Sequence, residues 1–181
     1  MTINYTDILK FWFEEVKPAQ WWTKSDEFDQ LIIDRYSVLY AQATRCELYQ
    51  WRETAEGRLA EIIVLDQFSR NMFRGSGFAF AFDSLALALS QQALASGADQ
   101  LIDEARRSFM YLPFMHSESK KIHVKALEIY QKLGNKGNID FEIRHKAIID
   151  RFGRYPHRNK VMGRESTDEE IEFLKNPGSG F

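Results

Sequence analysis

The sequence is short of the residues that mark several classes of protein. It contains one cysteine, four prolines and ten glycines among 181 residues. The single Cys46 cannot form an internal disulfide, which suits a reducing compartment. No apolar run approaches the roughly 20 residues that a membrane-spanning helix requires. The first ten residues also lack the basic and apolar regions of a signal peptide. These absences predict a soluble, cytoplasmic protein that has no membrane partner.

The sequence also lacks a strong excess of charge of either sign. It has 24 lysines and arginines against 26 acidic residues, for a net charge of -2. Such a balance gives no whole-chain attraction to nucleic acid, which we do not expect as a partner. Hydrophobic residues make up 44% of the chain and aromatic residues 14%, enough for a packed core. The length predicts a single domain over residues 1–181.

Apolar residues recur at helical spacing through most of the chain, and glycine and proline fall between the periodic segments. No segment shows the two-residue alternation of a strand with turn signals at both ends. The short run AFAF at residues 79–82 is read as the entry to a helix. The pattern predicts an all-α fold of seven or eight helices, mostly antiparallel neighbours. The expected helices cover about residues 5–16, 26–46, 53–73, 83–96, 103–115, 118–133, 139–152 and 167–176.

The third expected helix carries charge on an otherwise apolar surface. Asp66, Arg70 and Arg74 follow one another at intervals of four residues, so they share one face. One interpretation is a structural ion pair of Asp66 with Arg70, with Arg74 complementing the helix dipole. The other is that Asp66 orients Arg70 toward a cavity, because one carboxylate cannot satisfy two arginines.

A junction between two expected helices places His116 and Glu118 two residues apart. A histidine and a carboxylate so close can act as an acid/base pair, in which the carboxylate fixes the tautomer. The local alternative is that Ser117 caps the following helix and Glu118 lies in its first turn. The candidates for a catalytic role are therefore His116, Glu118 and His157.

The segment 151–164, RFGRYPHRNKVMGR, concentrates five cationic side chains and a histidine between two glycines and a proline. A bent, arginine-rich loop suits the binding of an anion, because guanidinium groups bind carboxylates and phosphates bidentately. The alternative is a solvated basic loop. The residues expected to bind the ligand are Arg70, Asn71, Arg74, His116, Arg154, His157, Arg158, Asn159 and Arg164.

Familiar cofactor and metal motifs are missing. There is no phosphate-binding glycine loop, no dinucleotide fingerprint, no serine elbow and no histidine spacing typical of zinc sites. His145 lies on an apolar helix face and is interpreted as a core histidine. The sequence therefore predicts neither a cofactor nor a bound metal.

Several longer motifs carry a family resemblance. In order, they are LDQFSRNMFR at 65–74, AFAFD at 79–83, YLPFMHSE at 111–118, RFGRYPHRN at 151–159, Gly163–Arg164 and STDEE at 166–170. With these motifs the whole chain resembles a bacterial family catalogued as domain of unknown function 924. The resemblance implies an all-helical, tetratricopeptide-like fold and no established activity. Ser69 stands where the family pattern has proline, and Lys146–Ala147 stand where it has a basic–acidic pair.

Three functions are compatible with these patterns. The first is a binding module whose arginines hold a carboxylate or phosphate on a small molecule, or an acidic peptide. The second is an enzyme that applies His/Glu acid–base chemistry to an anionic metabolite. In the third, the charged motifs form an internal salt-bridge network in a protein with an interaction role. The oligomeric state stays open, since Trp21 and Trp22 suit either a core or an interface.

Overall fold

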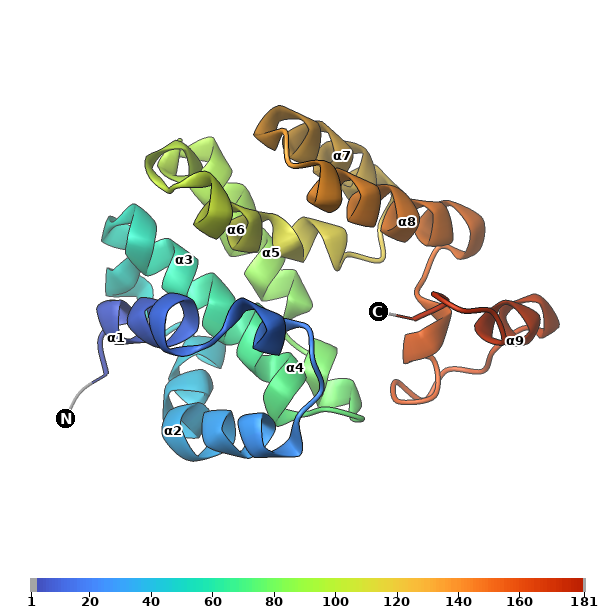
Figure 1. Ribbon diagram of the computed structural model, residues 1–181, viewed down its shortest axis with the longest axis horizontal. Helices are drawn as coiled ribbons and strands as arrows, with labels where there is room; N and C mark the ends of the chain where they lie inside the picture. The colour runs from blue at the N-terminus through green and yellow to red at the C-terminus, as the bar shows by residue number, and fades with distance from the viewer. Residues whose placement is uncertain (1–2, 181) are drawn as a thin grey trace. The chain divides into compact units, whose positions relative to one another are not determined.

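The computed structural model describes residues 3–180, and this part of the chain is helical without a β-strand (Figure 1). The π-helical turn η4 (Val64–Phe68) joins α3 to α4 in one continuous helix. The nine α labels of the described residues therefore correspond to eight helices, which confirms the predicted all-α class. The helices are α1 Tyr5–Lys10, α2 Asp26–Thr44, α3 Ala55–Ile63, α4 Ser69–Met72, α5 Asp83–Ala95, α6 Glu104–Met115, α7 Lys120–Leu133, α8 Lys136–Phe152 and α9 Asp168–Leu174. The tetratricopeptide-like arrangement stays a prediction.

The chain divides into two compact units. Unit 1 takes the residues up to Arg74 together with Phe78–Pro113, and unit 2 takes Gly75–Gly77 together with the residues from Phe114 onward. All four tryptophans of the sequence fall in unit 1, whereas all four histidines fall in unit 2.

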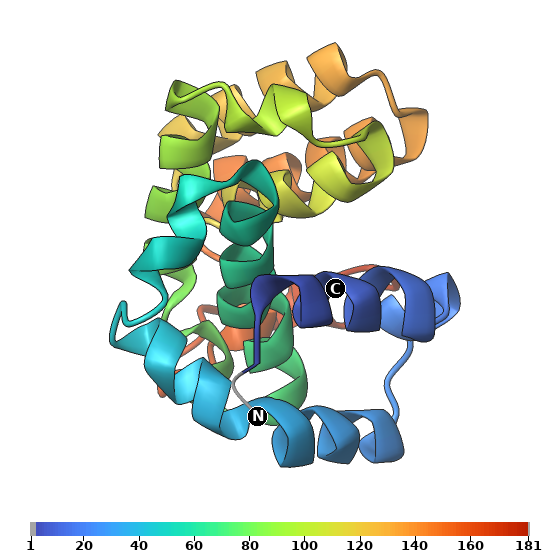
Figure 2. The same cartoon turned by 90° about the vertical axis from the view of Figure 1, so that its left-hand side faces the viewer.

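Unit 1 is built around the α3–α4 helix. Helices α1 and α5 contact α3, and α2 contacts α4 (Figures 1 and 2). A second π-helical turn, η1 (Phe11–Glu15), follows α1 and packs against η4 through aromatic rings. The ring centroids of Trp12 and Phe68 lie 5.5 Å apart, and both side chains are fully buried. Rings of this size dominate the energetics of a core.

Unit 2 is an antiparallel hairpin of α7 and α8 followed by an irregular segment and α9. Gly134 adopts a left-handed conformation with φ of 82°, which ends α7, and Asn135 caps α8 immediately afterwards. Gly153 ends α8 in the same way. Thr167 and Glu170 form the predicted capping box at the start of α9.

Three local predictions in unit 2 are wrong. The residue that precedes α7 is Ser119, and not the predicted cap Ser117. Gly137 lies inside α8 and does not separate two helices. The helical spacing of Phe141 with His145 and Ile148 predicts that Phe141 faces inward. Phe141 is instead 48% exposed, whereas the neighbouring Glu142 is fully buried. A buried polar contact of Glu142, described below, explains why Glu142 and not Phe141 faces inward.

Within residues 3–180, one segment, Gly77–Ala95, is long and apolar enough by composition to cross a membrane. A single such segment is weak evidence, because core helices meet the same criteria. Within it, α5 buries Ala86, Leu89 and Ala93 and carries the ion-paired Asp83 at its start. We interpret α5 as a helix of unit 1 that packs one face against α3.

Candidate functional site

Tyr155 anchors the arginine segment of unit 2 to the junction that precedes α7. Its side chain is fully buried directly after the turn at Gly153. Its hydroxyl donates to the Met115 carbonyl at 2.5 Å, and its backbone N–H donates to Glu118 Oε1 at 2.7 Å. These bonds bring together two motifs that lie about 40 residues apart in the sequence.

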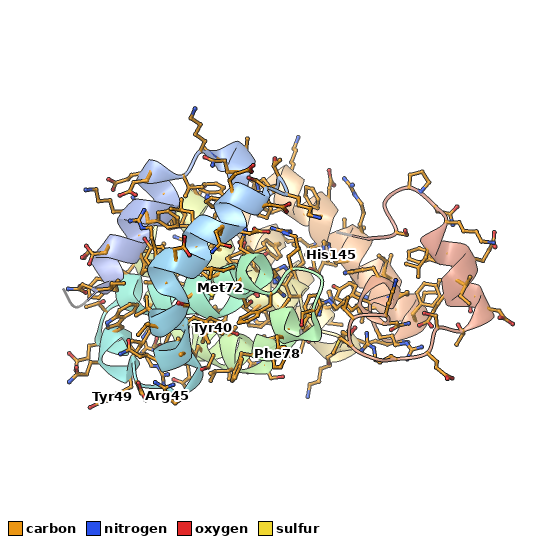
Figure 3. All side chains as sticks on the ribbon, turned by 90° about the horizontal axis from the view of Figure 1, so that it is seen from below. Tyr40, Arg45, Tyr49, Met72, Phe78 and His145 are labelled. Atoms are coloured by element: carbon orange, nitrogen blue, oxygen red, sulfur yellow. The ribbon has the colours of Figure 1, made fainter. Side chains whose placement is uncertain are left out.

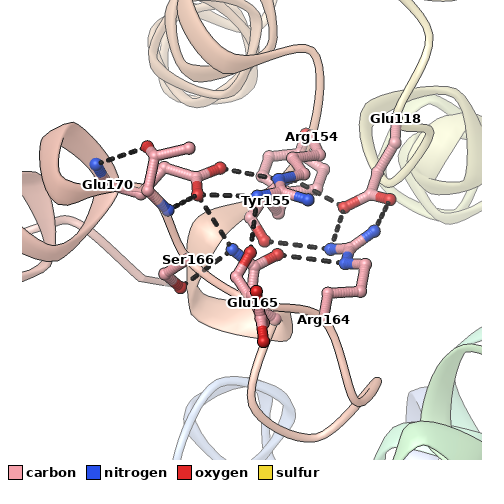
Figure 4. A network of polar contacts seen from close by, with 9 residues as sticks. Glu118, Arg154, Tyr155, Arg164, Glu165, Ser166 and Glu170 are labelled. Atoms are coloured by element: carbon pink, nitrogen blue, oxygen red, sulfur yellow. Dashed lines mark hydrogen bonds and ion pairs between the residues drawn. The ribbon is translucent and has the colours of Figure 1, made fainter.

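Arg164 completes this anchor by forming a two-pronged ion pair with Glu118 (Figure 4). The Nη1–Oε2 and Nη2–Oε1 distances are 2.5 and 2.9 Å, and Nε donates to Asn159 Oδ1 at 3.0 Å. Burial acts to raise the pKa of Glu118, but the bonds from Arg164 and from the Tyr155 N–H outweigh it and lower the pKa. Glu118 is therefore ionised at neutral pH.

Arg154 forms a second two-pronged pair, with Glu170 of α9. The two distances are 2.6 and 2.7 Å, and Arg154 Nη2 also donates to the Glu165 carbonyl (Figure 4). Asn159 Nδ2 donates to the same carboxylate at 3.2 Å. The bond from Arg154 is the main cause that lowers the pKa of Glu170 to about 2. Asp150, which lies four residues before Arg154, pairs with Lys146.

Arg158 is held differently. Its side chain is almost completely buried, and its guanidinium carbon lies 4.5 Å from the centroid of the Tyr155 ring. This is the geometry of a cation–π contact. The positive charge also favours the ionised form of Glu118. Arg158 is thus part of the packing around Tyr155.

Three histidine rings surround Tyr155. The ring centroids of His123, His145 and His157 lie 6.3, 5.8 and 5.5 Å from that of Tyr155. His145 Nδ1 lies 2.8 Å from the Phe141 carbonyl. Burial lowers the pKa of His145 to about 3, so this imidazole is neutral at physiological pH. It is buried, as expected of a core histidine.

A fully buried polar contact joins α7 to α8. His123 Nδ1 lies 2.8 Å from Glu142 Oε1, and both side chains are inaccessible to solvent. His123 Nε2 lies 2.8 Å from the Ser117 carbonyl and 3.2 Å from the Tyr155 hydroxyl. The Tyr155 proton is already donated to a carbonyl, so Nε2 must carry the proton in this contact. Burial raises the pKa of Glu142 despite its bond to His123.

The predicted residues of unit 1 form ion pairs of their own. Arg70 bonds both oxygens of Asp83, at 3.1 and 3.0 Å, and the Asp66 carbonyl at 2.6 Å. The expected pair of Arg70 with the Asp66 carboxylate is present at 3.4 Å. Arg74 bonds Asp29 at 2.5 and 2.8 Å. These contacts fasten α4 to its neighbours α5 and α2.

A side-chain amide supports the second of these pairs. Asn71 donates to Asp29 Oδ1 at 2.8 Å, so the carboxylate that binds Arg74 accepts three bonds. Burial acts to raise the pKa of Asp29, but the bonds from Arg74 and Asn71 lower it.

The predicted site residues are therefore divided between the two units. Unit 1 holds Arg70, Asn71 and Arg74. Unit 2 holds His116, Glu118, Arg154, His157, Arg158, Asn159 and Arg164. In the described part of the chain, residues 3–180, no group of three or more His, Cys, Asp or Glu residues is placed to hold a metal ion.

Sequence reasoning missed the His123–Glu142 pair, although a signal was present. His123 lies three and seven residues before Ala126 and Tyr130, so it shares their apolar face. Glu142 lies three residues before His145 on the buried face of α8. A polar residue at such a position has to find a partner on the facing helix.

The described residues define an all-α protein whose arginine motifs are paired with carboxylates of the same chain. Comparison with known proteins shows its family. The family model described as bacterial protein of unknown function (DUF924) matches residues 8–178, and the chain belongs to this family. The solved structure of the protein of unknown function ATU0120 from Agrobacterium tumefaciens is similar, with 38% sequence identity and a TM-score of 0.90. The match covers 94% of this chain and 96% of that one. No curated protein matches the chain.

Proposed function

We propose that the protein is a helical protein-interaction module whose arginine motifs brace the fold from within. The observation that supports this is the pairing of the predicted anion-binding arginines. Arg70, Arg74, Arg154 and Arg164 each bond both oxygens of a carboxylate in the same unit. An anionic ligand would have to displace these carboxylates, which are held at fixed positions on neighbouring elements.

The electrostatics support the same conclusion. The pKa of Glu118 and of Asp29 is lowered and that of Glu170 falls to about 2, so all three carboxylates stay charged at neutral pH. These carboxylates compensate the charges of Arg164, Arg74 and Arg154.

Large apolar side chains exposed on the surface support the proposed role in protein interactions. Trp22 is mostly exposed, and its ring stacks at 6.0 Å on Phe109. Tryptophan, tyrosine and arginine dominate the energetics of protein interfaces. The exposed thiol of Cys46 is compatible with a reducing cytoplasm, where we place the protein.

The test is a thermal-shift panel of phosphate, sulfate, nucleotides, sugar phosphates and di- and tricarboxylates at fixed ionic strength. A ligand that binds only the native state must stabilise it. We expect no selective response from the wild-type protein. Glu118→Gln uncovers the guanidinium of Arg164, and we expect this variant to melt earlier and to gain a response to small oxyanions.

The response of the wild-type protein to the anion panel decides between the internal brace and the anion-binding module. If one anion class stabilises the wild type selectively and this effect is abolished in Arg164→Leu or Arg154→Leu, the proposed internal brace is wrong. That result would instead support an anion-binding module. A matched control is Lys175→Leu, which removes a charge from the exposed pair with Glu172.

A second candidate is an acid/base enzyme, and the convergence of histidines on Tyr155 favours it. Half-buried His116 and His157 would exchange protons with a substrate, while the buried His123–Glu142 pair holds the site in place. Glu118, predicted to orient His116, instead bonds Arg164 and the Tyr155 N–H. Saturation-transfer NMR with a panel of phosphorylated and carboxylated metabolites tests this candidate. Binding that disappears in His157→Gln supports it, and no binding by the wild type counts against it.

A further inference from the structure

The solvent face of α7 in unit 2 is rich in lysine. The opposite face of α7 buries its apolar side chains and His123 where the helix packs on α8 (Figure 1). The inward side chains of α8 include His145, labelled in Figure 3. The lysines lie around Val124, which is 64% exposed. We call Lys120, Lys121, Val124, Lys125 and Lys132 the lysine face; all five side chains are exposed.

The charge of the lysine face is compensated only in part within the chain. Glu128, the one acidic residue of α7, accepts from Lys125 at 3.0 Å and from Lys132 at 2.8 Å. Lys120 and Lys121 form no ion pair with any residue that the structure describes. Four lysines against one glutamate therefore leave the face with a net positive charge.

Local stability does not account for two of these lysines. Lys120 and Lys121 lie in the first turn of α7, where the positive end of the helix dipole disfavours a cation. The first turn of α9 follows the rule, with Asp168, Glu169 and Glu170. A residue that breaks a local rule without an internal partner is typical of a functional surface. The two lysines are therefore better explained by a partner outside the chain.

The composition of the lysine face distinguishes among anionic partners. A lipid surface would need the apolar face of α7, and that face is buried against α8. Nucleic acid is disfavoured because Glu128 would face its phosphates. The sequence of α7 also contains no arginine, and its one aromatic ring, that of Tyr130, is buried, so neither can contact a base. A protein segment rich in carboxylates fits both the lysines and the apolar Val124.

We propose that the lysine face is the docking surface for an acidic segment of a partner protein. Carboxylates of the segment meet the lysines, and an apolar side chain of the segment meets Val124. Helix α7 has 14 residues and is therefore about 20 Å long, which matches an acidic helix of the same length. This inference rests on the proposed interaction function and names the chemistry of its partner.

The experiment measures the binding of a labelled synthetic peptide to the full chain by fluorescence anisotropy. The peptide is as long as α7 and carries glutamates on both sides of a line of leucines. A control peptide has glutamine in place of every glutamate. We expect the acidic peptide to bind with an affinity that falls as salt is added, because the contact is made by exposed charges. The glutamine peptide should not bind.

The main variant is Lys120→Glu/Lys121→Glu, which reverses two charges of the lysine face. Its fold should be retained, because acidic residues in the first turn of α7 complement the helix dipole. Binding of the acidic peptide should weaken by about tenfold or more, since two attractions become repulsions. The matched control is Lys160→Glu/Lys175→Glu, which makes the same change of net charge at exposed positions outside α7 and should bind nearly as well as the wild type.

A second variant tests the apolar part of the contact. Val124→Ser should weaken binding of the acidic peptide while its salt dependence stays that of the wild type, because no charge is changed. Far-UV circular dichroism and the melting temperature establish that each variant is folded.

Four outcomes overturn the inference. The acidic peptide does not bind the wild type, Lys120→Glu/Lys121→Glu binds it as tightly as the wild type, or the control Lys160→Glu/Lys175→Glu loses as much affinity. The fourth is that phosphatidylserine vesicles or a DNA duplex bind more tightly than the peptide, through the same two lysines. Failure of the peptide removes only the partner named here, whereas a selective response of the arginine motifs to the anion panel removes the interaction module itself.

Discussion

Arg164 and Glu118 face one another across 46 residues of sequence and share two hydrogen bonds of 2.5 and 2.9 Å. The pair joins the end of the arginine segment to the junction that precedes α7, and the backbone N–H of Tyr155 completes it. Because each partner is three-quarters buried, the loss of either one leaves the other charge poorly solvated.

The first prediction concerns this pair. Arg164→Leu should lower the free energy of unfolding by about 2 kcal/mol, because it leaves the mostly buried Glu118 carboxylate with fewer partners. Urea unfolding followed by circular dichroism measures the change. Lys175→Leu, which breaks the exposed pair with Glu172, should change stability by no more than about 0.5 kcal/mol. Equal effects of the two substitutions would show that the buried pair has no special role.

The second prediction concerns the buried pair of α7 and α8. Glu142→Gln keeps the shape and a hydrogen-bonding group beside His123 Nδ1, so it should cost about 1 kcal/mol. Glu142→Ala removes the partner and opens a cavity, at a cost of about 3 kcal/mol. The two variants are compared by urea unfolding at neutral pH. If Glu142→Gln is as harmful as Glu142→Ala, the carboxylate charge itself is required and the pair is ionic.

The third prediction is a pH dependence caused by His145. Burial lowers the pKa of this imidazole from 6.5 to about 3. Between these pH values the unfolded chain therefore binds a proton at His145 that the folded protein does not bind. Its contribution to stability is complete above pH 6.5 and is lost as the pH falls toward 3. In the middle of that window the loss is about 1.4 kcal/mol per pH unit.

The measurement compares wild type with His145→Gln. The difference between their unfolding free energies should shrink or change sign as the pH falls from about 6 to about 4, with the slope that one proton gives. The comparison isolates His145 from the other groups that titrate in unit 2. Parallel stability curves for the two proteins would exclude a neutral, buried His145.

The fourth prediction concerns the start of α9. Thr167→Ala removes the hydroxyl that accepts the Glu170 N–H, and should destabilise the first turn by about 1 kcal/mol. Hydrogen exchange of residues 168–174 should quicken, while exchange in the α7–α8 hairpin stays unchanged. Arg154→Leu should quicken the same amides more strongly, because it also releases the Glu170 side chain from the loop.

Short-range features were predictable from the sequence because they obey local rules. The pair of Asp66 with Arg70 follows from four-residue spacing on one helix, and the Thr167–Glu170 box follows from its motif. The partner of Arg164 was not predictable in the same way. Several carboxylates were equally available in the sequence, and packing of the chain decided among them.

The misplacement of Phe141 has a related cause. Hydrophobicity alone favours burying Phe141, but the register of α8 places Glu142 opposite His123. The buried contact of His123 with Glu142 fixes which face of α8 turns inward, because each of these polar groups needs its partner. The spacing of hydrophobic residues does not contain that information. The adjacent Phe141 is then left at the surface.

The separation of tryptophan from histidine gives each unit its own optical or magnetic signal. Trp12, Trp21, Trp22 and Trp51 lie in unit 1, so fluorescence excited selectively at tryptophan, beyond the tyrosine absorption band, reports the melting of that unit alone. The imidazole resonances of the four histidines report unit 2 alone. An unlabelled sample therefore shows whether the two units unfold in one cooperative step or in two. If they unfold in two steps, the two signals show which unit unfolds first.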